Sequence, residues 1–437
     1  MSRQTPPRPS TLEEWLIYWE NLHQGQSIDL GLQRVKAVSA RFAWHINTPI
    51  ITVAGTNGKG SVCAFLTAIY RAAGFSVGAF FSPHIHRFNE RITLNNQPVD
   101  DDTLISAFER LDHIRAEISL TYFEANTLAA MLIFLEGKVD VIILEVGLGG
   151  RLDAVNLFDA NVAILSNVDL DHQAYLGDTR EAIGREKAGI FRQGRPAIVG
   201  EQNPPESVLE VINDIGAVPL MYGLDFFYEK MSSQWNFSFQ PRVKGYQAQQ
   251  KFALPFPILR GSYQLGNASM ALCAIECLRE YLPVDVGSIK KGLLSVRHPG
   301  RFEILPQRPM VVLDVAHNPH AALALRRDLH CLPYAKKHFA VFAMFSDKAV
   351  EEVVHILKGE FEHWFIAPLP SRRSACCAYI RDVLLKQEIK AVTICKTIPL
   401  AYQAAMKQAN EEDRIVVFGS FLTVAGAMRV ISNVQEK

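Results

Sequence analysis

The glycine-rich segment GTNGKGS, at residues 55–61, limits the fold of this chain more than any other feature. It follows an apolar run at residues 49–54 and opens a stretch with helical spacing at about residues 61–73. A glycine loop between a strand and a helix predicts a phosphate site, because glycines let backbone N–H groups approach phosphate oxygens and the helix N-terminus adds positive partial charge. Lys59 is expected to neutralise the β- and γ-phosphates, and the Ser61 hydroxyl to reach Mg²⁺.

The loop departs from the GxxxxGK[ST] pattern, because Gly60 separates Lys59 from Ser61 and the first glycine stands closer to the lysine. An ordinary glycine turn is the alternative interpretation. The coincidence of strand, lysine, hydroxyl and helix favours the phosphate loop.

Strand-like and helix-like stretches alternate through the first part of the chain. An amphipathic helix is expected at residues 11–25, with Trp15 and Trp19 on one face. Strands are expected at residues 49–54, 76–81, 139–146 and 161–166, and further helices at residues 61–73 and 126–136. This alternation predicts an α/β fold with a mostly parallel sheet, crossover helices and functional loops at the carboxyl ends of the strands.

The pattern changes after about residue 201. Residues 201–261 mix proline, aromatic and polar residues without a helical period, which indicates an antiparallel patch or hairpins. A helix is expected at residues 267–280, and the sequence RHPGR at residues 297–301 suits a hinge. Four further strands are expected, at residues 310–315, 338–344, 362–367 and 414–419. The chain should therefore divide into domains at residues 1–297 and 298–437, the second a smaller α/β domain.

Composition narrows the function classes. The 437 residues contain 45 Lys and Arg against 45 Asp and Glu, whereas a protein that coats nucleic acid needs excess positive charge. No apolar run approaches the roughly 18 residues of a membrane-spanning helix, and the N-terminus lacks the apolar core of a secretion signal. The seven cysteines form no CxxC pair, and Cys273 and Cys277 are spaced for one helix face. These features indicate a reduced, soluble, cytoplasmic protein without a nucleic-acid or membrane partner.

Polar residues follow several of the predicted strands. A hydroxyl such as that of Ser82 can be a weak Mg²⁺ ligand there, although loop capping is the more common role. Glu145 closes an otherwise apolar strand, where a carboxylate is costly to bury unless it is paired or metal-bound. A salt-bridged core glutamate is the alternative. His172 follows Asp169 and Asp171 and is a candidate metal ligand. A lone histidine is more often structural, but a position beside the strand of Glu145 favours the ligand.

Other polar residues carry a weaker signal. The spacing of Lys187 indicates no more than a solvated helix lysine. Arg301, Asp314 and His317 come close to the predicted hinge, and Asp314 closes a strand, where a carboxylate can accept hydrogen bonds from ribose hydroxyls. A structural role is about equally expected for each of these three residues taken alone.

Taken together, the motifs resemble one family, the bifunctional dihydrofolate synthase/folylpolyglutamate synthases within the Mur ligase group of ATP-dependent amide-forming enzymes. The resemblance covers nearly the whole chain in order and in spacing. The segments that carry it are DLGLQRV (29–35), VAGTNGKGS (53–61), FSPHIHRFNERI (81–92), TYFEANTLAA (121–130), ILEVGLGGRLDAVN (143–156), DLDHQAYLG (169–177), REKAGIF (185–191), HPGRFE (298–303), LDVAHNP (313–319) and GSFLTVAG (419–426).

The resemblance implies a P-loop-containing, Mur-ligase-like N-terminal domain and a smaller Rossmann-like C-terminal α/β domain that closes over ATP and binds glutamate. It assigns two Mg²⁺ ions to Ser61, Ser82, Glu145 and His172. It assigns ATP to Gly58, Lys59, Gly60, Ser61, Asn267, Arg301 and Asp314. Lys59, Lys187 and His317 are implied as catalytic residues, and Lys187 matches the lysine that the family carbamylates. Tyr263 departs from the histidine often found in relatives, so the nucleotide contacts around it are less certain.

The resemblance also implies where the pteridine substrate binds. The residues implied for this binding site are Leu30, Gly31, Leu32, Phe123, Arg151, Asp153 and Ala154. Phe123 can stack on a flat pterin, and Asp153 can accept hydrogen bonds from pterin N–H groups. The alternative is that residues 29–35 only pack the N-terminal helix onto the sheet and that Asp153 caps a turn.

The activity implied is ATP-dependent ligation of L-glutamate to dihydropteroate and to tetrahydrofolates, through an acyl phosphate. The expected partners are these small molecules and ATP, and the expected protein is a monomer. Another Mur-type amide ligase would share the phosphate loop and the metal ligands but should lack DLGLQRV and SPHIHRFNER. A P-loop GTPase would need an NKxD-type motif, which the sequence lacks.

Overall fold

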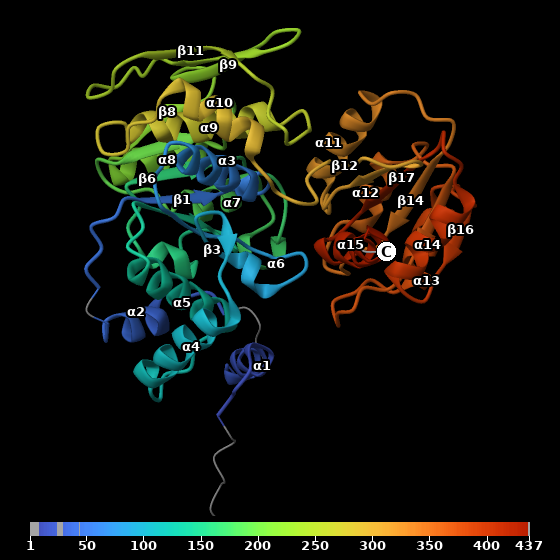
Figure 1. The fold of residues 1–437 in the computed structure, drawn as a ribbon, viewed down its shortest axis with the longest axis horizontal. Helices are drawn as coiled ribbons and strands as arrows, with labels where there is room; N and C mark the ends of the chain where they lie inside the picture. The colour runs from blue at the N-terminus through green and yellow to red at the C-terminus, as the bar shows by residue number, and fades with distance from the viewer. Residues whose placement is uncertain (1–7, 24–28, 43, 436–437) are drawn as a thin grey trace, which may run out of the picture. The chain divides into compact units, whose positions relative to one another are not determined.

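The computed structural model describes residues 8–23, 29–42 and 44–435, and the chain forms two compact units (Figure 1). The first comprises Met1–Val168, Arg180–Phe256 and Asn267–Ser295. The second comprises Asp169–Thr179, Pro257–Gly266 and Val296–Lys437, so it takes in two short internal segments as well as the C-terminal part of the chain. The domain division at residues 297 and 298 stays a prediction.

An eight-stranded sheet organises the described part of the first unit. Its order is β4-β3-β2-β5-β1-β6-β7-β8, and all neighbours from β2 to β8 are parallel, whereas β3 and β4 are antiparallel. This confirms the predicted mostly parallel α/β fold. The strands are β1 (Ile50–Ala54), β2 (Val77–Phe80), β3 (Ile92–Leu94), β4 (Gln97–Pro98), β5 (Val141–Glu145), β6 (Val162–Leu165), β7 (Pro196–Val199) and β8 (Val218–Met221).

Helices lie on both faces of this sheet (Figure 1). On one side are α3 (Lys59–Ala72), α9 (Gln264–Cys277) and α10 (Val286–Ser295), and on the other are α4 (Asp101–Arg115) and α5 (Tyr122–Glu136). Because both faces are covered, every residue of β1 and β5 is buried, which explains their continuous apolar runs. The carboxyl ends of β2, β5 and β1 meet at one edge, where the predicted phosphate loop and polar residues follow.

Residues 201–261 contain the predicted antiparallel patch, the three-stranded sheet β11-β10-β9, with β9 (Phe226–Lys230), β10 (Trp235–Phe239) and β11 (Gln249–Leu254). The prediction that this region has no helical period was wrong, because α8 spans Glu206–Ile215 and buries Val208 and Ile212. Pro204 and Pro205 precede that helix and give the segment the composition of a loop.

The second unit contains a six-stranded sheet in the order β12-β13-β17-β14-β15-β16, parallel except for the β12–β13 pair. The four strands predicted in this part are confirmed as β13 (Met310–Leu313), β14 (His338–Phe342), β15 (His363–Ile366) and β17 (Arg414–Phe418). The short edge strands β12 (Glu303–Leu305) and β16 (Val392–Ile394) were not predicted. The surrounding helices are α11 (Pro319–His330), α12 (Val350–Ile356), α13 (Cys377–Lys386), α14 (Ile398–Gln408) and α15 (Phe421–Gln435).

The remaining helices confirm or extend the sequence analysis. The N-terminal helix α1 spans Leu12–Leu22 and buries Trp15 and Trp19, as predicted. Both Cys273 and Cys277 lie on α9, and all seven cysteines are free thiols. Within the described residues, none of the helices combines the length and the apolar character that a bilayer crossing requires.

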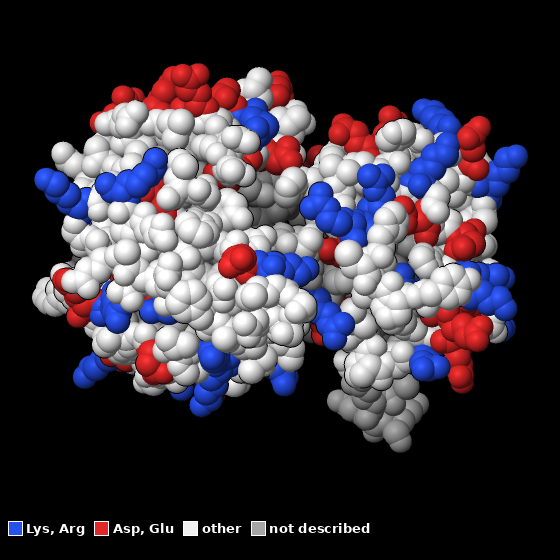
Figure 2. All heavy atoms as spheres, turned by 90° about the horizontal axis from the view of Figure 1, so that it is seen from above, with Lys and Arg blue, Asp and Glu red and all other residues white. Residues whose placement is uncertain are grey.

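Figure 2 shows acidic and basic side chains distributed in small groups over the face in view.

Candidate active site

The loop after β1 adopts the conformation that its glycines permit. Gly58 has φ of 85° and caps the N-terminus of α3, and a Cβ atom there would lie 2.6 Å from Oδ1 of Asn267. A Cβ atom on Gly55 would lie 1.8 Å from Oγ of Ser166. Ser166, at the end of β6, donates its hydroxyl to the carbonyl oxygen of Asn57 at 2.6 Å. The loop is therefore braced by β6 and by Asn267, one of the predicted ATP contacts.

Lys59 and Ser61 both lie at the start of α3. The Lys59 ammonium donates to the carbonyl oxygens of Gly55 (3.0 Å) and Thr56 (3.2 Å), so its side chain curls over its own loop. Ser61 is 1% exposed. The backbone N–H groups of a helix N-terminus beside a lysine provide an anion site of the kind that phosphates occupy.

Glu145 and Ser82 are brought together at the ends of neighbouring strands. Glu145 ends β5 and is buried, and its Oε2 accepts a hydrogen bond from the backbone N–H of Ser82 at 3.0 Å. The described residues contain no cluster of three or more His, Cys, Asp or Glu side chains suited to a metal ion. The predicted ligand set contains one carboxylate, one imidazole and two hydroxyls, so it is not such a cluster and stays a prediction.

Lys187 is buried at the end of α7 (Arg180–Ala188), and its Nζ lies 2.9 Å from the carbonyl oxygen of Gly55. The sequence spacing indicated only a solvated helix lysine, and that expectation was wrong. The side chain instead reaches across 132 positions of sequence to the phosphate loop. Lys187 therefore contacts the same carbonyl group as Lys59.

Phe123, the predicted pterin-stacking residue, lies against the loop that follows β5. A Cβ atom on Gly147 would lie 2.6 Å from the Phe123 ring, so only a glycine allows this contact. The ring centroid of Phe123 lies 5.6 Å from that of Phe80, at the end of β2. The Phe123 ring therefore contacts the backbone two positions after Glu145, at the same edge of the sheet.

Asp153 caps the turn beside Phe123. Its two carboxylate oxygens accept hydrogen bonds from the backbone N–H groups of Leu148 (2.8 Å) and Val155 (3.0 Å). Burial raises the pKa of Asp153 to about 6, against the effect of these hydrogen bonds. The turn-capping alternative therefore describes an observed contact, and the pterin-reading role stays a prediction. Ala154 is buried in the short 3₁₀ helix that follows, and Arg151 pairs with Glu186 of α7 at 2.7 Å.

The predicted substrate loop Leu30–Gly31–Leu32 is fastened by a group of charged residues that the sequence analysis did not single out. Arg34, on α2 (Gln33–Ser39), donates to Oδ2 of Asp29 at 2.6 Å and to the Asp29 carbonyl oxygen at 2.9 Å. It also pairs with the buried carboxylate of Glu124 at 3.2 Å. Glu124 lies beside Phe123 on α5, so Arg34 joins the loop to the helix that carries the aromatic ring.

In the second unit, Asp314 follows β13 and is buried. Its carboxylate accepts backbone hydrogen bonds from Phe302 (2.8 Å) and Ala316 (2.7 Å), and burial raises its pKa to about 6. Arg301 stacks over the ring of Phe421, 4.8 Å from the centroid. Burial raises the pKa of Tyr263 well above its usual range, and the negative charge of Asp314 acts in the same direction. The residue that departs from the family pattern therefore lies near two predicted ATP contacts.

Asp171 connects His317 to a lysine that the sequence analysis did not identify. Its carboxylate lies 3.6 Å from Nε2 of His317 and forms an ion pair with Lys348. Burial alone would raise the pKa of Asp171, but the hydrogen bond from His317 and the charge of Lys348 hold it well below its usual range. Nζ of Lys348 also lies 3.3 Å from Nε2 of His172. All four residues belong to the second unit.

Comparison with known proteins identifies the architecture. Residues 53–275 match the Mur ligase middle domain and residues 300–421 match the glutamate ligase domain of Mur ligases. The chain is 40% identical over 430 residues to the dihydrofolate synthase/folylpolyglutamate synthase of Escherichia coli strain K12, which covers 98% of this chain and 97% of the relative. The chain belongs to the dihydrofolate synthase/folylpolyglutamate synthase family of Mur ligases.

Solved structures of this family have the same fold. FolC of Escherichia coli in complex with DHPP and ADP is 40% identical, with a TM-score of 0.90 over 99% of this chain and 100% of that one. A bifunctional folylpolyglutamate synthase/dihydrofolate synthase with Mn, AMPPNP and L-glutamate bound is 38% identical, with a TM-score of 0.88 over 98% of this chain and 100% of that one. Structures of relatives thus contain a divalent metal, an ATP analogue and glutamate.

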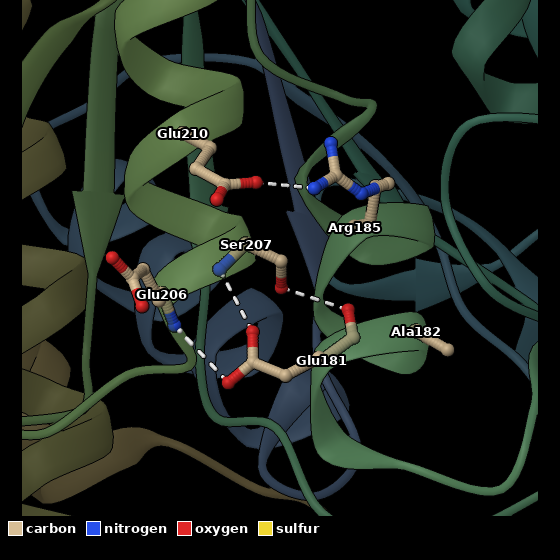
Figure 3. Close-up of a pocket in the computed structure, with 6 residues that line it drawn as sticks. All are labelled: Glu181, Ala182, Arg185, Glu206, Ser207 and Glu210. Atoms are coloured by element: carbon tan, nitrogen blue, oxygen red, sulfur yellow. Dashed lines mark hydrogen bonds and ion pairs between the residues drawn. The ribbon is translucent and has the colours of Figure 1, made fainter.

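In this member of the family, a junction between two helices positions Lys187. The carboxylate of Glu181, at the start of α7, accepts hydrogen bonds from the backbone N–H groups of Glu206 (3.2 Å) and Ser207 (2.8 Å) on α8. The Ser207 hydroxyl donates to the Glu181 carbonyl oxygen, and Arg185 pairs with Glu210 (Figure 3). A surface pocket lies between these side chains. We assign this pocket a structural role, since it holds in place the helix that carries Lys187.

Proposed function

We propose that this member of the family joins L-glutamate to dihydropteroate, forming dihydrofolate, and to reduced folates, forming folylpolyglutamates, with ATP as the co-substrate. The observation that carries the proposal is the similarity over nearly the full length to a bifunctional enzyme of both activities. The retained loop at residues 29–35, fastened to the Phe123 helix by Arg34, supports the dihydropteroate activity. The alternative, another Mur-type amide ligase, would act on a different acid.

The reaction requires activation of a carboxylate, which is a poor electrophile because its leaving group would be oxide. Transfer of the ATP γ-phosphoryl group to the substrate carboxylate forms an acyl phosphate, and the leaving group becomes phosphate. The amino group of glutamate then attacks the acyl carbon, and the tetrahedral intermediate collapses to the amide and phosphate. The task of the protein is mainly alignment and neutralisation of charge.

Residues of this chain have distinct parts in that task. Lys59 and the N-terminus of α3 hold the phosphates, and Arg301 and Asn267 contact the nucleotide. Lys187 acts as a carbamate, since an anion beside the loop can support a cation that an ammonium group would repel. Asp314 accepts hydrogen bonds from the ribose, and His317 contacts the reacting groups.

A divalent cation fits the chemistry of the ligands proposed for it. Mg²⁺ prefers oxygen ligands and is usually held by one or two carboxylates together with substrate phosphates and water. Glu145 supplies a buried carboxylate beside the phosphate loop, with Ser61 and Ser82 as hydroxyl ligands and His172 as a further ligand. We propose two Mg²⁺ ions in these positions, where bound metal supplies neutralisation of phosphate charge.

Product analysis tests the function. Purified protein is incubated with ATP, Mg²⁺ and glutamate and with dihydropteroate or tetrahydrofolate, and products are identified by mass spectrometry. We expect dihydrofolate from the first acid and a polyglutamate series from the second. Protein that extends tetrahydrofolate but leaves dihydropteroate untouched would overturn the bifunctional proposal, and protein that uses neither would favour another amide ligase.

Isotope transfer tests the intermediate. When the substrate carboxylate carries ¹⁸O, one labelled oxygen must leave with the phosphate, because the acyl phosphate breaks between carbon and oxygen. Unlabelled phosphate released together with normal amide formation would exclude this mechanism. We also propose that the protein works as a monomer and that it is cytoplasmic. The free state of its seven cysteines fits the reducing environment of that compartment.

A further inference from the structure

Arg91 carries a half-buried guanidinium group that forms no ion pair with any carboxylate among the described residues. It lies at the end of the 3₁₀ helix Phe88–Arg91, directly before β3. Its Nε donates to Nδ1 of His84 at 2.9 Å, whereas in the part of the chain that the structure describes neither of its Nη atoms bonds to a protein group. A guanidinium has five N–H donors, so most of its capacity is unused.

Aromatic rings surround this guanidinium. Its Cζ lies 5.9 Å from the ring centroid of Phe88 and 5.8 Å from that of Tyr122. Burial lowers the pKa of Arg91, while the more distant charge of Glu145 acts in the opposite direction. A cation removed from water among rings binds an anion more strongly than an exposed cation does.

The charges of three carboxylates, those of Glu145, Glu20 and Glu90, act on Arg91, and two of these carboxylates accept hydrogen bonds from backbone groups of other residues. The carboxylate of Glu90 accepts three backbone hydrogen bonds of 2.7 to 2.9 Å, from Ile85, His86 and Arg87, and so organises the loop itself. Glu145 accepts the backbone N–H of Ser82. Neither forms an ion pair with Arg91 in the described structure, so the guanidinium is not needed to neutralise either one by direct contact.

The position of Arg91 coincides with the path between the two ends of the proposed substrate site. The backbone N–H of Phe81 donates to the Arg91 carbonyl oxygen at 2.7 Å, which places Arg91 beside Ser82, one of the proposed metal ligands. On the other side, Tyr122 is the neighbour of Phe123, the proposed pterin-stacking residue. In dihydropteroate a benzoate ring separates the pterin from the carboxylate that reacts. An acid with its pterin at Phe123 would direct that carboxylate towards Glu145 and past Arg91.

We propose that Arg91 is a substrate-binding residue whose two free Nη groups bind the reacting carboxylate of the pteroate or folate and hold it for phosphorylation. The hydrogen bond to His84 fixes the orientation of the guanidinium fork, and the two rings restrict its plane. A planar fork of two N–H donors matches a carboxylate in a bidentate geometry that lysine cannot reproduce. This assignment rests on the proposed function, because the anion is identified as the acid of that reaction.

Binding of dihydropteroate and of its methyl ester tests the assignment, measured by calorimetry with ADP, which cannot phosphorylate either ligand. The ester keeps the pterin and the ring but has no charge. We expect the wild type to bind the acid about 30- to 100-fold more tightly than the ester, because a charged hydrogen-bonded pair is lost. Arg91→Met should reduce this ratio to about one, and Arg91→Lys should give an intermediate ratio.

Arg87→Met is the matched control, because Arg87 lies in the same loop but is exposed and pairs with Asp101 at 3.0 Å. It should keep the wild-type ratio. The ratio of the two dissociation constants does not change when a fraction of the variant protein is misfolded. If Arg91→Met does not fold at all, Arg91→Lys replaces it as the test variant. An unchanged ratio in both Arg91 variants, or a wild-type ratio near one, would overturn the assignment. Wild type that prefers the acid but forms no amide would count against the proposed function alone.

Discussion

Nζ of Lys187 lies 2.9 Å from the carbonyl oxygen of Gly55, so the end of α7 is bonded directly to the first residue of the phosphate loop. The Lys59 ammonium donates to the same oxygen at 3.0 Å. Two ammonium groups that share one carbonyl oxygen would repel each other. A carbamate on Lys187 would remove this repulsion and keep an N–H donor for Gly55.

Lys187→Ala should therefore lower kcat by at least about 100-fold, because an anion that supports the cation site is lost. Acetate should restore part of the activity by occupying the space of the carbamate. With ¹³CO₂, the wild type should show a carbamate resonance in the ¹³C NMR spectrum and Lys187→Ala should lack it. Lys36→Ala, on the exposed face of α2, is the control and should keep the resonance. A free ammonium on Lys187 in a structure of the active, nucleotide-bound enzyme would refute the carbamate.

Glu145 should be the most sensitive of the proposed metal ligands, because its carboxylate carries more negative charge than a hydroxyl or an imidazole. Glu145→Ala should abolish turnover, and Glu145→Gln should weaken Mn²⁺ binding, followed by electron paramagnetic resonance, by roughly tenfold or more. Ser82→Ala and His172→Ala should each raise the Mg²⁺ concentration needed for half-maximal activity. Near-normal turnover of Glu145→Ala at ordinary Mg²⁺ would show that the assignment is wrong.

The sequence predicts those parts of the molecule that are continuous in the chain. Apolar runs such as β1 and β5 are buried on both faces, so their sequences carry the burial directly. The phosphate loop is also local, because its conformation depends on its own glycines. The edge strand β12 was missed because its three residues are all only partly buried, and such a strand leaves no alternating pattern.

Contacts between distant segments were not predictable in the same way. Arg34 and Glu124 are 90 positions apart, and nothing in either segment indicates the partner. Lys348 lies in the loop after β14, 177 positions from Asp171, where a lysine has the composition of an ordinary surface residue. Lys187 was assigned by resemblance, whereas its periodicity suggested exposure. These side chains became interpretable only when the fold brought their elements together.

Arg34 should matter for the dihydropteroate site in particular. Its removal releases Asp29 from α2 and leaves the buried carboxylate of Glu124 without its cation, so the loop at residues 29–32 loses its attachment. Arg34→Met should raise KM for dihydropteroate by roughly tenfold and change KM for ATP little. Lys36→Met removes a charge from the same helix and should leave both values unchanged. Equal increases in both KM values would indicate a general loss of structure.

The pKa of Asp314 gives a test by pH. Burial raises it to about 6, whereas an unfolded aspartate titrates near 4. Between these two pH values the folded state therefore binds more protons than the unfolded state. The contribution of this carboxyl to the free energy of unfolding is fully present below about pH 4 and is lost as the pH rises through about 6. The loss is roughly 3 kcal/mol of unfolding free energy.

Asp314→Asn should remove this part of the pH dependence. Denaturant unfolding between pH 4.5 and 7 should show that the difference in stability between Asp314→Asn and the wild type shifts in favour of the variant as the pH rises. The exposed Asp382→Asn is the control in the same unit and should follow the wild type. Parallel stability curves for Asp314→Asn and the wild type would contradict a raised pKa.

Asp153 combines a structural contact with a proposed role in substrate recognition. Its oxygens already accept the N–H groups of Leu148 and Val155, and a carboxylate has about four lone-pair sites, so a pterin N–H could bind as well. Dihydropteroate binds mainly through its ring, whereas longer folates are held also by their glutamate tail. Asp153→Ala should therefore lower kcat/KM for dihydropteroate at least about tenfold more than for tetrahydrofolate. The exposed Asp159→Ala should change neither value. If Asp153 only caps the turn, both substrates should lose kcat/KM equally, in step with a lower melting temperature.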